Sequence, residues 1–249
     1  MAVQGIPVRL FFMHNMGMVS VEKESLVHFI NLAAAYCRGG YRSEQPEYND
    51  LAEKPGTDNF EQIVADVRSC EMCRLCKTRT NAVPGEGSLE PLVMVIGEGP
   101  GSDEDATGRP FVGKAGQLLD KMLGSIGLSR ESNCFIANVI KCRPPGNRDP
   151  SPDETAACAS FLERQIQILK PHFILCAGKI AAQTLLQTSE PIGKLRGKFT
   201  EYQCSGMAIP FLVSYHPSAL LRSEDLKRPA WEDLKLLRSA LIDAGLVEK

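Results

Sequence analysis

The sequence predicts an α/β fold in which a mainly parallel central sheet is covered by helices on both faces. Three mainly apolar runs, at residues 92–96, 134–140 and 173–177, have the length and composition of strands buried on both sides. Helical patterns separate these runs, and a helix between two strands is the usual crossover of a parallel pair. Sites in such sheets lie at the carboxyl ends of the strands, so the residues after each strand are the first candidates.

The expected helices carry signals for where they begin. Residues 59–69 have an amphipathic pattern that leads into Cys70. The helix expected at 152–169 has Pro152 in its first turn, and two acidic residues follow that favour the positive end of its dipole. The remaining expected elements are helices at 116–126, 179–187 and 230–244, and strands at 198–203 and 209–214.

Residues 1–57 differ from the rest and are expected to be an N-terminal extension and linker. Residues 21–37 have a helical pattern, whereas the stretch that follows is polar and rich in turn-forming Gly and Pro. We expect this arm to be accessory and partly disordered. Residues 58–249 are expected to form the functional domain.

Composition excludes several classes of protein. The 249 residues include 28 Lys and Arg against 30 Asp and Glu, a net charge of −2, with 43% hydrophobic residues. This balance is typical of a globular chain and argues against wholesale disorder or nucleic-acid binding by bulk charge, so any such site must be a local basic patch. The sequence shows neither an apolar run of membrane-spanning length nor a signal peptide, and a cytoplasmic protein is expected.

Nine cysteines are the main chemical signal. An odd count in a reducing compartment argues against a disulfide framework and favours a metal or cluster site. Cys70 and Cys73 form a C-x-x-C pair, and with Cys142 and Cys158 they could make a four-cysteine set for zinc or an iron–sulfur cluster. Cys76 is a rival ligand, and the spacing does not choose the metal. Two further cysteines, Cys134 and Cys176, lie in apolar strand patterns and are expected to be buried.

Two glycine-rich segments resemble nucleotide-binding motifs without matching them. Residues 97–101 read G-x-G-x-G, lack the dinucleotide spacing, and are followed by acidic residues that would repel a pyrophosphate. Residues 108–115 approach the phosphate-binding loop pattern, but Ala115 replaces the hydroxyl that would hold Mg²⁺. Neither segment therefore predicts nucleotide binding.

A histidine follows the last expected strand, where sites gather. His216 opens a loop stiffened by proline, and Leu220 and Leu221 stand beside Arg222. An isolated histidine is more often structural than catalytic, but adjacent leucines in a loop beside an arginine would suit an apolar wedge next to a phosphate contact.

Together these segments resemble the family 4 uracil-DNA glycosylases, the iron–sulfur group of that superfamily. The resemblance covers residues 59–244 and rests on four motifs in order: GEGPG at 97–101, TGRPFVGKAG at 107–116, NVIKCRPP at 138–145 and HPSALLR at 216–222. It implies a three-layer α/β/α sandwich. It also implies a structural [4Fe–4S] cluster held by Cys70, Cys73, Cys142 and Cys158, with Cys76 as an extra thiol.

The resemblance implies a monofunctional hydrolase that flips uracil out of DNA and leaves an abasic site. Phe111 is expected to stack on the base, and Asn138 to bind its edge. His216 is expected to stabilise the departing uracil anion. Glu98 is the first candidate to position the base or water, with Glu104 second. The backbone around the base is expected to come from Gly97 and Gly99.

Uracil-containing DNA, single- or double-stranded, is the expected partner of a protein that is otherwise a monomer. A contact with a sliding clamp is left open. Leu220 and Leu221 are expected to fill the gap in the base stack. The basic residues expected to hold phosphates are Arg143 and Arg222, together with Lys141, Arg148 and Lys198.

The sequence leaves three alternatives open. One is a superfamily member that attaches covalently to uracil-containing DNA, although the histidine-bearing insertion expected after Gly116 is absent. Another is a non-catalytic DNA-binding module that keeps the fold and the cluster. The third is a zinc protein with the same four cysteines, which would be colourless.

Overall fold

A computed structural model describes residues 59–248. The expected extension at 1–57 and the helix expected at 21–37 lie outside the described residues. Within the described range, no helix is long and apolar enough to cross a membrane.

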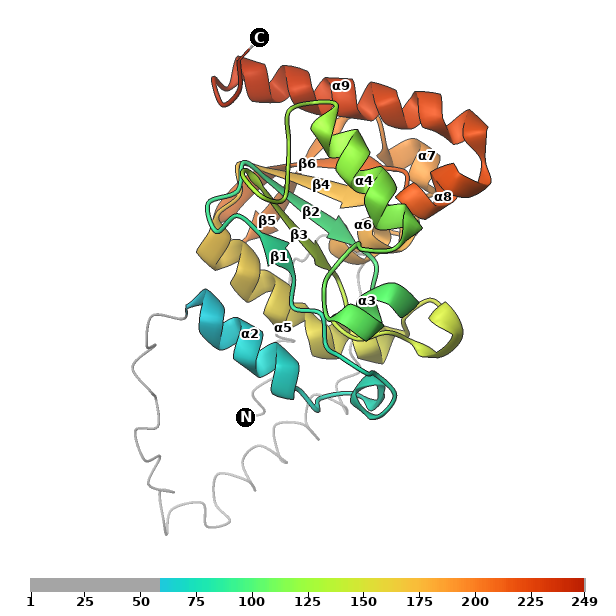
Figure 1. The fold of residues 1–249 in the computed structure, drawn as a ribbon. Coiled ribbons are helices and arrows are strands. Elements are labelled where there is room, and N and C mark those ends of the chain that lie inside the picture. The colour runs from blue at the N-terminus through green and yellow to red at the C-terminus, as the bar shows by residue number, and fades with distance from the viewer. Residues whose placement is uncertain (1–58, 249) are drawn as a thin grey trace, which may run out of the picture. The chain divides into compact units, whose positions relative to one another are not determined.

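A single six-stranded sheet, ordered β1-β3-β2-β4-β6-β5, forms the centre of the described domain (Figure 1). The four inner strands pair in parallel, and the two edge strands, β1 and β5, are antiparallel to their neighbours. The expectation of a mainly parallel sheet is therefore confirmed. The strands are β1 (Glu86–Gly87), β2 (Val93–Gly97), β3 (Cys134–Asn138), β4 (Phe173–Ala177), β5 (Phe199–Cys204) and β6 (Met207–Ser214).

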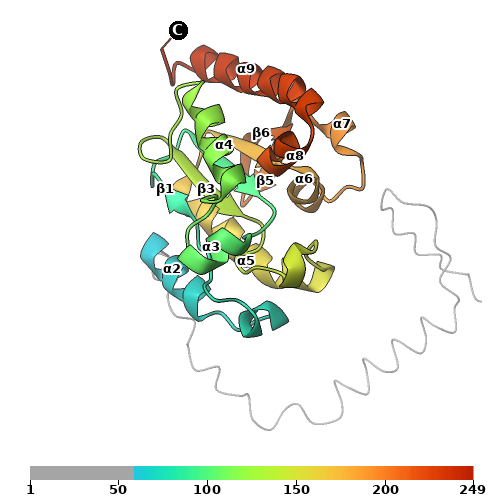
Figure 2. The same cartoon turned by 45° about the vertical axis from the view of Figure 1, so that its right-hand side comes forward.

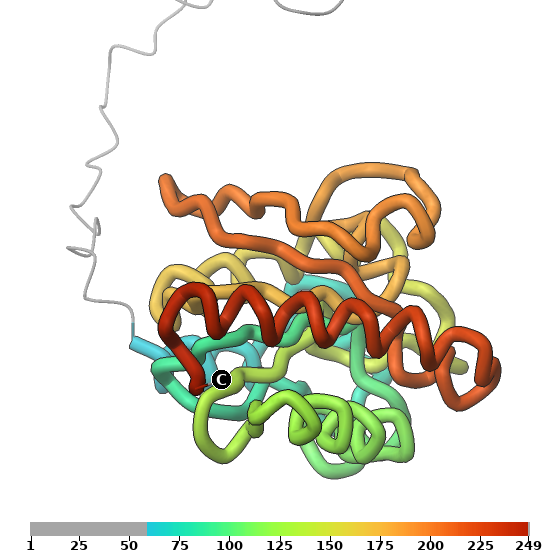
Figure 3. Tube along the Cα trace, turned by 90° about the horizontal axis from the view of Figure 1, so that it is seen from above, coloured from blue at the N-terminus to red at the C-terminus, as the bar shows by residue number. Residues whose placement is uncertain are grey.

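Helices cover both faces of the sheet, which makes the three-layer sandwich (Figure 2). One face carries α2 (Phe60–Ser69), α5 (Pro152–Leu169), α6 (Lys179–Leu185) and α7 (Ile192–Leu195). The other carries α4 (Lys114–Gly124) and α9 (Lys227–Asp243), which contact each other; Figure 3 shows α9 as one long helix alongside α4. The short elements are α3 (Ser102–Thr107), α8 (Pro217–Arg222), η1 (Arg74–Lys77), η2 (Pro145–Asn147) and η3 (Glu224–Leu226).

The inner strands supply side chains alternately to the two faces, since successive residues of a strand point to opposite sides. In β2, Val93 and Val95 join the core under α4 and α9, whereas Met94 and Ile96 join the core under α2 and α5. All five residues of β2 are buried. This is why the strand reads as a continuous apolar run and not as an alternating one.

Helix capping accounts for the start of α5, whose bounds agree with those expected. Ser151 is the N-cap, and the backbone N–H of Ser151 donates to Glu154 Oε2 at 2.9 Å in a capping box. Pro152 fills the first helical position, where no backbone donor is needed. The helix ends at Lys170, which adopts a left-handed backbone conformation.

Two segments expected to be loops are short helices. The acidic stretch after β2 forms α3, and its first turn contains Asp103, Glu104 and Asp105, where negative charge is favoured by the helix dipole. The segment after His216 forms α8, with His216 as its N-cap. Both helices are six residues long, too short to show the periodicity that predicts a helix from sequence.

Candidate active site and cysteine pocket

A cavity of about 640 Å³ opens at the carboxyl ends of the parallel strands. This volume lies in the usual range for small-molecule sites. Gly97 and Asn138 are the last residues of β2 and β3 and lie opposite each other in the sheet. His216 follows the end of β6 by two residues. The strand order therefore brings together three of the sequence motifs at one edge.

Asn138 presents a buried acceptor that has no partner. Its side chain is almost fully buried, at 1% exposure, and Oδ1 has no hydrogen-bond partner among the described residues. An unpaired buried acceptor carries a desolvation cost of about 1–3 kcal/mol. Since Asn138 lines the cavity, a ligand that donates a hydrogen bond there would remove that cost.

Gly97 leaves room for both Asn138 and Phe111. A Cβ at position 97 would lie 2.5 Å from Asn138 Oδ1 and 2.5 Å from the Phe111 ring. No side chain fits at that distance, so the glycine is required by close packing and not by its backbone angles. Gly99 lines the cavity, whereas Gly97 does not, and a Cβ at Gly99 would lie 2.7 Å from the Ile140 side chain.

Phe111 lies in the cavity wall beside the histidine. Its ring centroid is 5.5 Å from that of His216, with the rings tilted by 33°. The backbone of Phe111 has φ +52, a left-handed conformation that is uncommon for an aromatic residue. The ring and the Asn138 amide thus offer a flat apolar surface and a polar edge to one ligand.

His216 is held as a neutral imidazole. The backbone N–H of Ser218 donates to Nδ1 at 3.1 Å, so Nδ1 carries a lone pair and the proton lies on Nε2. The pKa of His216 is lowered to about 4, chiefly by burial and also by the charge of Arg222, while Glu104 opposes the shift. Near neutral pH the ring therefore has an Nε2–H that can donate into the site.

Glu98 and Glu104 both line the cavity but make different contacts. Burial raises the pKa of Glu98 to about 7, with the nearby carboxylate of Asp149 as a second cause. Such a shift is frequent among groups that move protons in active sites.

Glu104 instead accepts hydrogen bonds from three backbone amides. Its Oε1 bonds the N–H groups of Val112 and Gly113 at 2.8 and 3.0 Å, and its Oε2 bonds that of Gly101 at 3.1 Å. These contacts join the glycine loop to the Phe111 turn. They do not fit the expected role as a second water-positioning carboxylate, because the carboxylate is already engaged.

The two leucines of α8 have opposite surroundings. Leu221 is 51% exposed, whereas Leu220 is only 3% exposed. A side chain that enters a duplex must be available at the surface, so the burial of Leu220 does not fit the role expected for it. Arg222 is exposed and lines the cavity.

The expected phosphate-binding residues also differ in their surroundings. Lys141 is 1% exposed, and its Nζ donates to Asn138 O at 2.9 Å and Gln165 Oε1 at 2.7 Å, so its expected phosphate contact is wrong. Arg148 is paired with Glu154. Arg143 is partly buried and donates from Nε to Asn147 Oδ1 at 2.7 Å. Lys198 is exposed.

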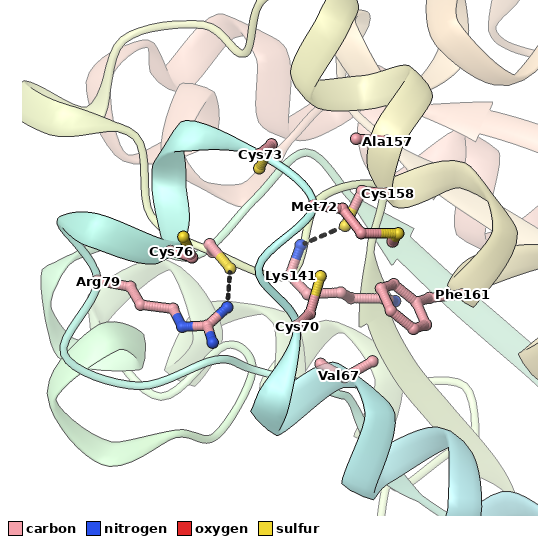
Figure 4. A pocket seen from close by; sticks show the side chains of 11 residues that line it. Val67, Cys70, Met72, Cys73, Cys76, Arg79, Lys141, Ala157, Cys158 and Phe161 are labelled. Carbon is pink, nitrogen blue, oxygen red and sulfur yellow. Dashed lines mark hydrogen bonds between the residues drawn. The ribbon is translucent and has the colours of Figure 1, made fainter.

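Five cysteines line a second, smaller pocket between α2, η1 and α5 (Figure 4). Cys70, Cys73 and Cys76 come from the segment after α2, and Cys142 and Cys158 come from the β3–α5 region. Arg79 donates from Nη1 to Cys142 Sγ at 3.0 Å, and the backbone N–H of Lys141 donates to Cys158 Sγ at 3.3 Å. Within residues 59–248, no three His, Cys, Asp or Glu side chains converge closely enough to hold a single metal ion.

Other cysteines behave as core residues. Cys134 and Cys176 are fully buried in β3 and β4, as expected, and burial raises the pKa of Cys134 to about 12. Thiols in such surroundings stay protonated and unreactive.

Three residues that support the site were missed by sequence reasoning. Arg79 contacts a cysteine, Arg130 contacts the Phe111 turn, and Glu154 joins η1 to α5. Each acts across at least 19 residues of chain, and no local pattern signals such a contact.

Comparisons with known proteins agree with the geometry. A family model described as the uracil DNA glycosylase superfamily matches residues 84–235. A type-4 uracil-DNA glycosylase of Saccharolobus solfataricus is 44% identical over 74% of this chain and 87% of its own. Those of Archaeoglobus fulgidus and Thermotoga maritima are 42% and 43% identical, over 72% and 74% of this chain and 91% and 96% of theirs.

Proposed function

The chain belongs to the uracil DNA glycosylase superfamily, and from this premise we infer that it excises uracil from DNA. It is a hydrolase that cleaves the N-glycosidic bond between the base and deoxyribose. A base inside a duplex is out of reach of a cavity at the edge of a sheet, so the nucleotide must be flipped out. The product is free uracil and an abasic site in an unbroken strand.

The unpartnered Oδ1 of Asn138 is the observation that carries this proposal for the present site. Uracil has a donor at N3 and an acceptor at O4, so one amide can accept from N3–H with Oδ1 and donate to O4 with Nδ2. Cytosine has an acceptor at N3 and a donor at C4, and it would leave Oδ1 facing another acceptor. The same contact therefore binds uracil and rejects cytosine.

His216 supports departure of the base. As the glycosidic bond breaks, negative charge develops on uracil O2, and a preorganised donor stabilises that charge in a site shielded from water. The Nε2–H of neutral His216 is such a donor. A neutral ring strengthens its hydrogen bond as the charge grows and does not require a proton to be transferred to the base.

Glu98 supports the sugar side of the reaction. Its ionised carboxylate can stabilise positive charge on the deoxyribose and accept a proton from the attacking water. The pKa of about 7 places the group where both protonation states are accessible near neutral pH.

DNA is proposed to be held by a local patch of basic residues, since a chain with a net charge of −2 cannot bind it by bulk charge. Leu221 is the residue proposed to fill the space left by the flipped nucleotide, because it is the exposed leucine of α8. Arg222 and Arg143 are proposed to contact phosphates beside it. Leu220 anchors α8 in the core.

Four cysteines are proposed to hold a [4Fe–4S] cluster. Cys70, Cys73, Cys142 and Cys158 fit such a group because their thiols surround a pocket, and each thiolate of a four-iron cluster binds its own iron. A single zinc ion would instead draw four sulfurs to about 2.3 Å from one point. When bound, the cluster would crosslink the segment after α2 to the β3–α5 region.

Cys76 lines the same pocket, so ligand assignment needs a test of its own. The purified protein should be brown and contain about four irons and four sulfides per chain. Cys70→Ser, Cys73→Ser, Cys142→Ser and Cys158→Ser should each lose visible absorbance and iron, whereas Cys76→Ser should keep both. A colourless protein containing zinc would contradict the cluster.

Residues 58–249 are proposed to form the complete glycosylase domain, acting as a monomer in the cytoplasm. The family match, at residues 84–235, lies within this range.

The experiment for the function is a base-release assay with the purified full-length chain. Oligonucleotides that contain one uracil, single-stranded or paired with guanine or adenine, are incubated with the protein, and free base and strand breakage at abasic sites are measured. Release of the single uracil is expected, with cleavage of the DNA strand only after treatment with alkali. Binding to abasic DNA without base release would instead indicate a non-catalytic module, and DNA retained through denaturation would indicate covalent attachment.

A further inference from the structure

Phe111 adopts a backbone conformation that must be imposed by its surroundings. An aromatic residue in the left-handed region costs of order 1–3 kcal/mol, and such residues persist where neighbouring structure determines them. The direction of the Phe111 ring depends on this turn. Whatever holds the turn therefore controls where the base-stacking surface lies.

A buried arginine, Arg130, makes hydrogen bonds that hold the Phe111 turn. Arg130 is 6% exposed, and it donates from Nη1 to Pro110 O at 2.8 Å and from Nη2 to Phe111 O at 2.9 Å. Asp120 of α4 accepts from Arg130 Nε at 3.0 Å and Nη2 at 2.7 Å, which fixes the plane of the guanidinium. A planar fork with several donors suits two adjacent carbonyls and a carboxylate together.

Helix α4 encloses the same carbonyl from another side. A Cβ at Gly116 would lie 1.9 Å from Phe111 O, so the first turn of α4 packs directly against the Phe111 backbone. The carbonyl is thus held between a helix and a charged donor. Arg130 itself does not line the substrate cavity.

We propose that Arg130 is a positioning residue for uracil excision, which acts by fixing the Phe111 turn so that the ring is ready to stack on the flipped base. The inference rests on the proposed function, because it assigns a role in that same site. Removing the guanidinium releases two carbonyls and lets the turn relax toward ordinary backbone angles. The ring then leaves its stacking position, although no substrate contact has been deleted.

The test compares Arg130→Met, Arg130→Lys, Phe111→Ala and the Arg130→Met/Phe111→Ala double variant. Base–aromatic stacking corresponds to roughly 5- to 150-fold in binding, and Arg130→Met is expected to lose kcat/KM within that range. Product inhibition by free uracil should weaken in parallel. Arg130→Lys should not restore activity, since an ammonium group cannot reproduce the fork. The exposed Lys121→Met, on the same helix as Asp120, removes one positive charge as a matched control and should behave as wild type.

The double variant separates positioning from general stabilisation. If Arg130 acts through the Phe111 ring, the double variant should be no worse than Phe111→Ala alone. Losses that multiply, or Arg130→Met activity within twofold of wild type, would overturn the inference. If Arg130→Met does not fold, Arg130→Gln keeps one amide donor and takes its place in the same comparison. A wild-type protein that releases no uracil would instead contradict the proposed function.

Discussion

Leu220 and Leu221 are adjacent in sequence but differ in exposure, 3% against 51%. Leu221→Ala should reduce uracil release from duplex DNA by roughly an order of magnitude, because the gap in the stack is left unfilled. Release from single strands should change little. The matched variant Leu220→Ala should instead lower the free energy of unfolding by about 2–5 kcal/mol, since it empties a core position. Equal effects of Leu221→Ala on both DNA forms would argue against the wedge.

The unpaired acceptor of Asn138 is expected to lower the stability of the folded protein while it provides a contact for uracil. Asn138→Leu replaces the amide by an apolar group of similar shape and removes the unpaired buried acceptor, so the thermal unfolding temperature should stay the same or rise. The specificity constant for uracil should fall at least about 100-fold. Calorimetry and base-release kinetics on the same preparation test both halves. A variant that loses activity only because it unfolds would contradict the assignment.

Glu98 and His216 together predict the pH dependence. Ionised Glu98 and neutral His216 are the active forms, so the single-turnover rate should rise with pH around a midpoint near 7 and stay level above it. The protonation of His216 near pH 4 lies below this rise. Glu98→Gln should be slow and lack the midpoint near 7. The same midpoint in Glu98→Gln would assign it to another group.

The pKa of Glu98 also makes a stability prediction. Because its folded pKa lies above the ordinary 4.5, the folded state binds the extra proton between about 4.5 and 7, and stability falls as pH rises through that window. Glu98→Gln should remove this fall, as measured by urea unfolding at several pH values.

At the scale of elements, the inner strands and long helices could be predicted because burial on both faces leaves a continuous apolar run. The bounds of β4 and α5 agree with those expected, and α4 begins two residues earlier than expected. The helices α3 and α8 could not be predicted, since their starts depend on Gly101 and His216 as caps and not on periodicity. The two-residue β1 is defined only by its pairing with β3.

Glu154 links two elements that carry cysteines. Its fully buried carboxylate accepts hydrogen bonds from Arg148 and from Arg74 of η1, and Arg148 is the main reason that its pKa lies well below the ordinary value. A lowered folded pKa adds stability above the ordinary 4.5 that is lost as pH falls through the folded value.

Glu154→Gln should therefore be less stable than wild type at neutral pH, and the difference should narrow in acid. Denaturant unfolding at neutral and acid pH measures this. Asp153→Asn is the matched control, because Asp153 is exposed and 3.8 Å from Arg74. A constant difference across pH would place the effect of Glu154→Gln in packing instead of charge.

For the whole molecule, the sequence predicts which residues gather but not what holds them. Parallel strands bring Gly97, Asn138 and the residues after β6 to one edge, so the site follows from topology. The tautomer of His216 depends on one backbone amide and the engaged carboxylate of Glu104 on three, and no sequence pattern reveals these contacts. The hydrogen bond between Arg130 and Phe111, which are 19 residues apart in the chain, is likewise not signalled by any sequence pattern.

The proposed function depends most on the recognition of uracil through the unpartnered Oδ1 of Asn138 in this cavity. The most direct measurement is chromatography of free bases after wild type and Asn138→Leu are each incubated with matched single-stranded oligonucleotides containing uracil or cytosine at one position. Wild type should release uracil and no cytosine, and the folded variant should release at least about 100-fold less uracil. Cytosine released as readily as uracil, or a folded Asn138→Leu that matches wild type, would contradict it.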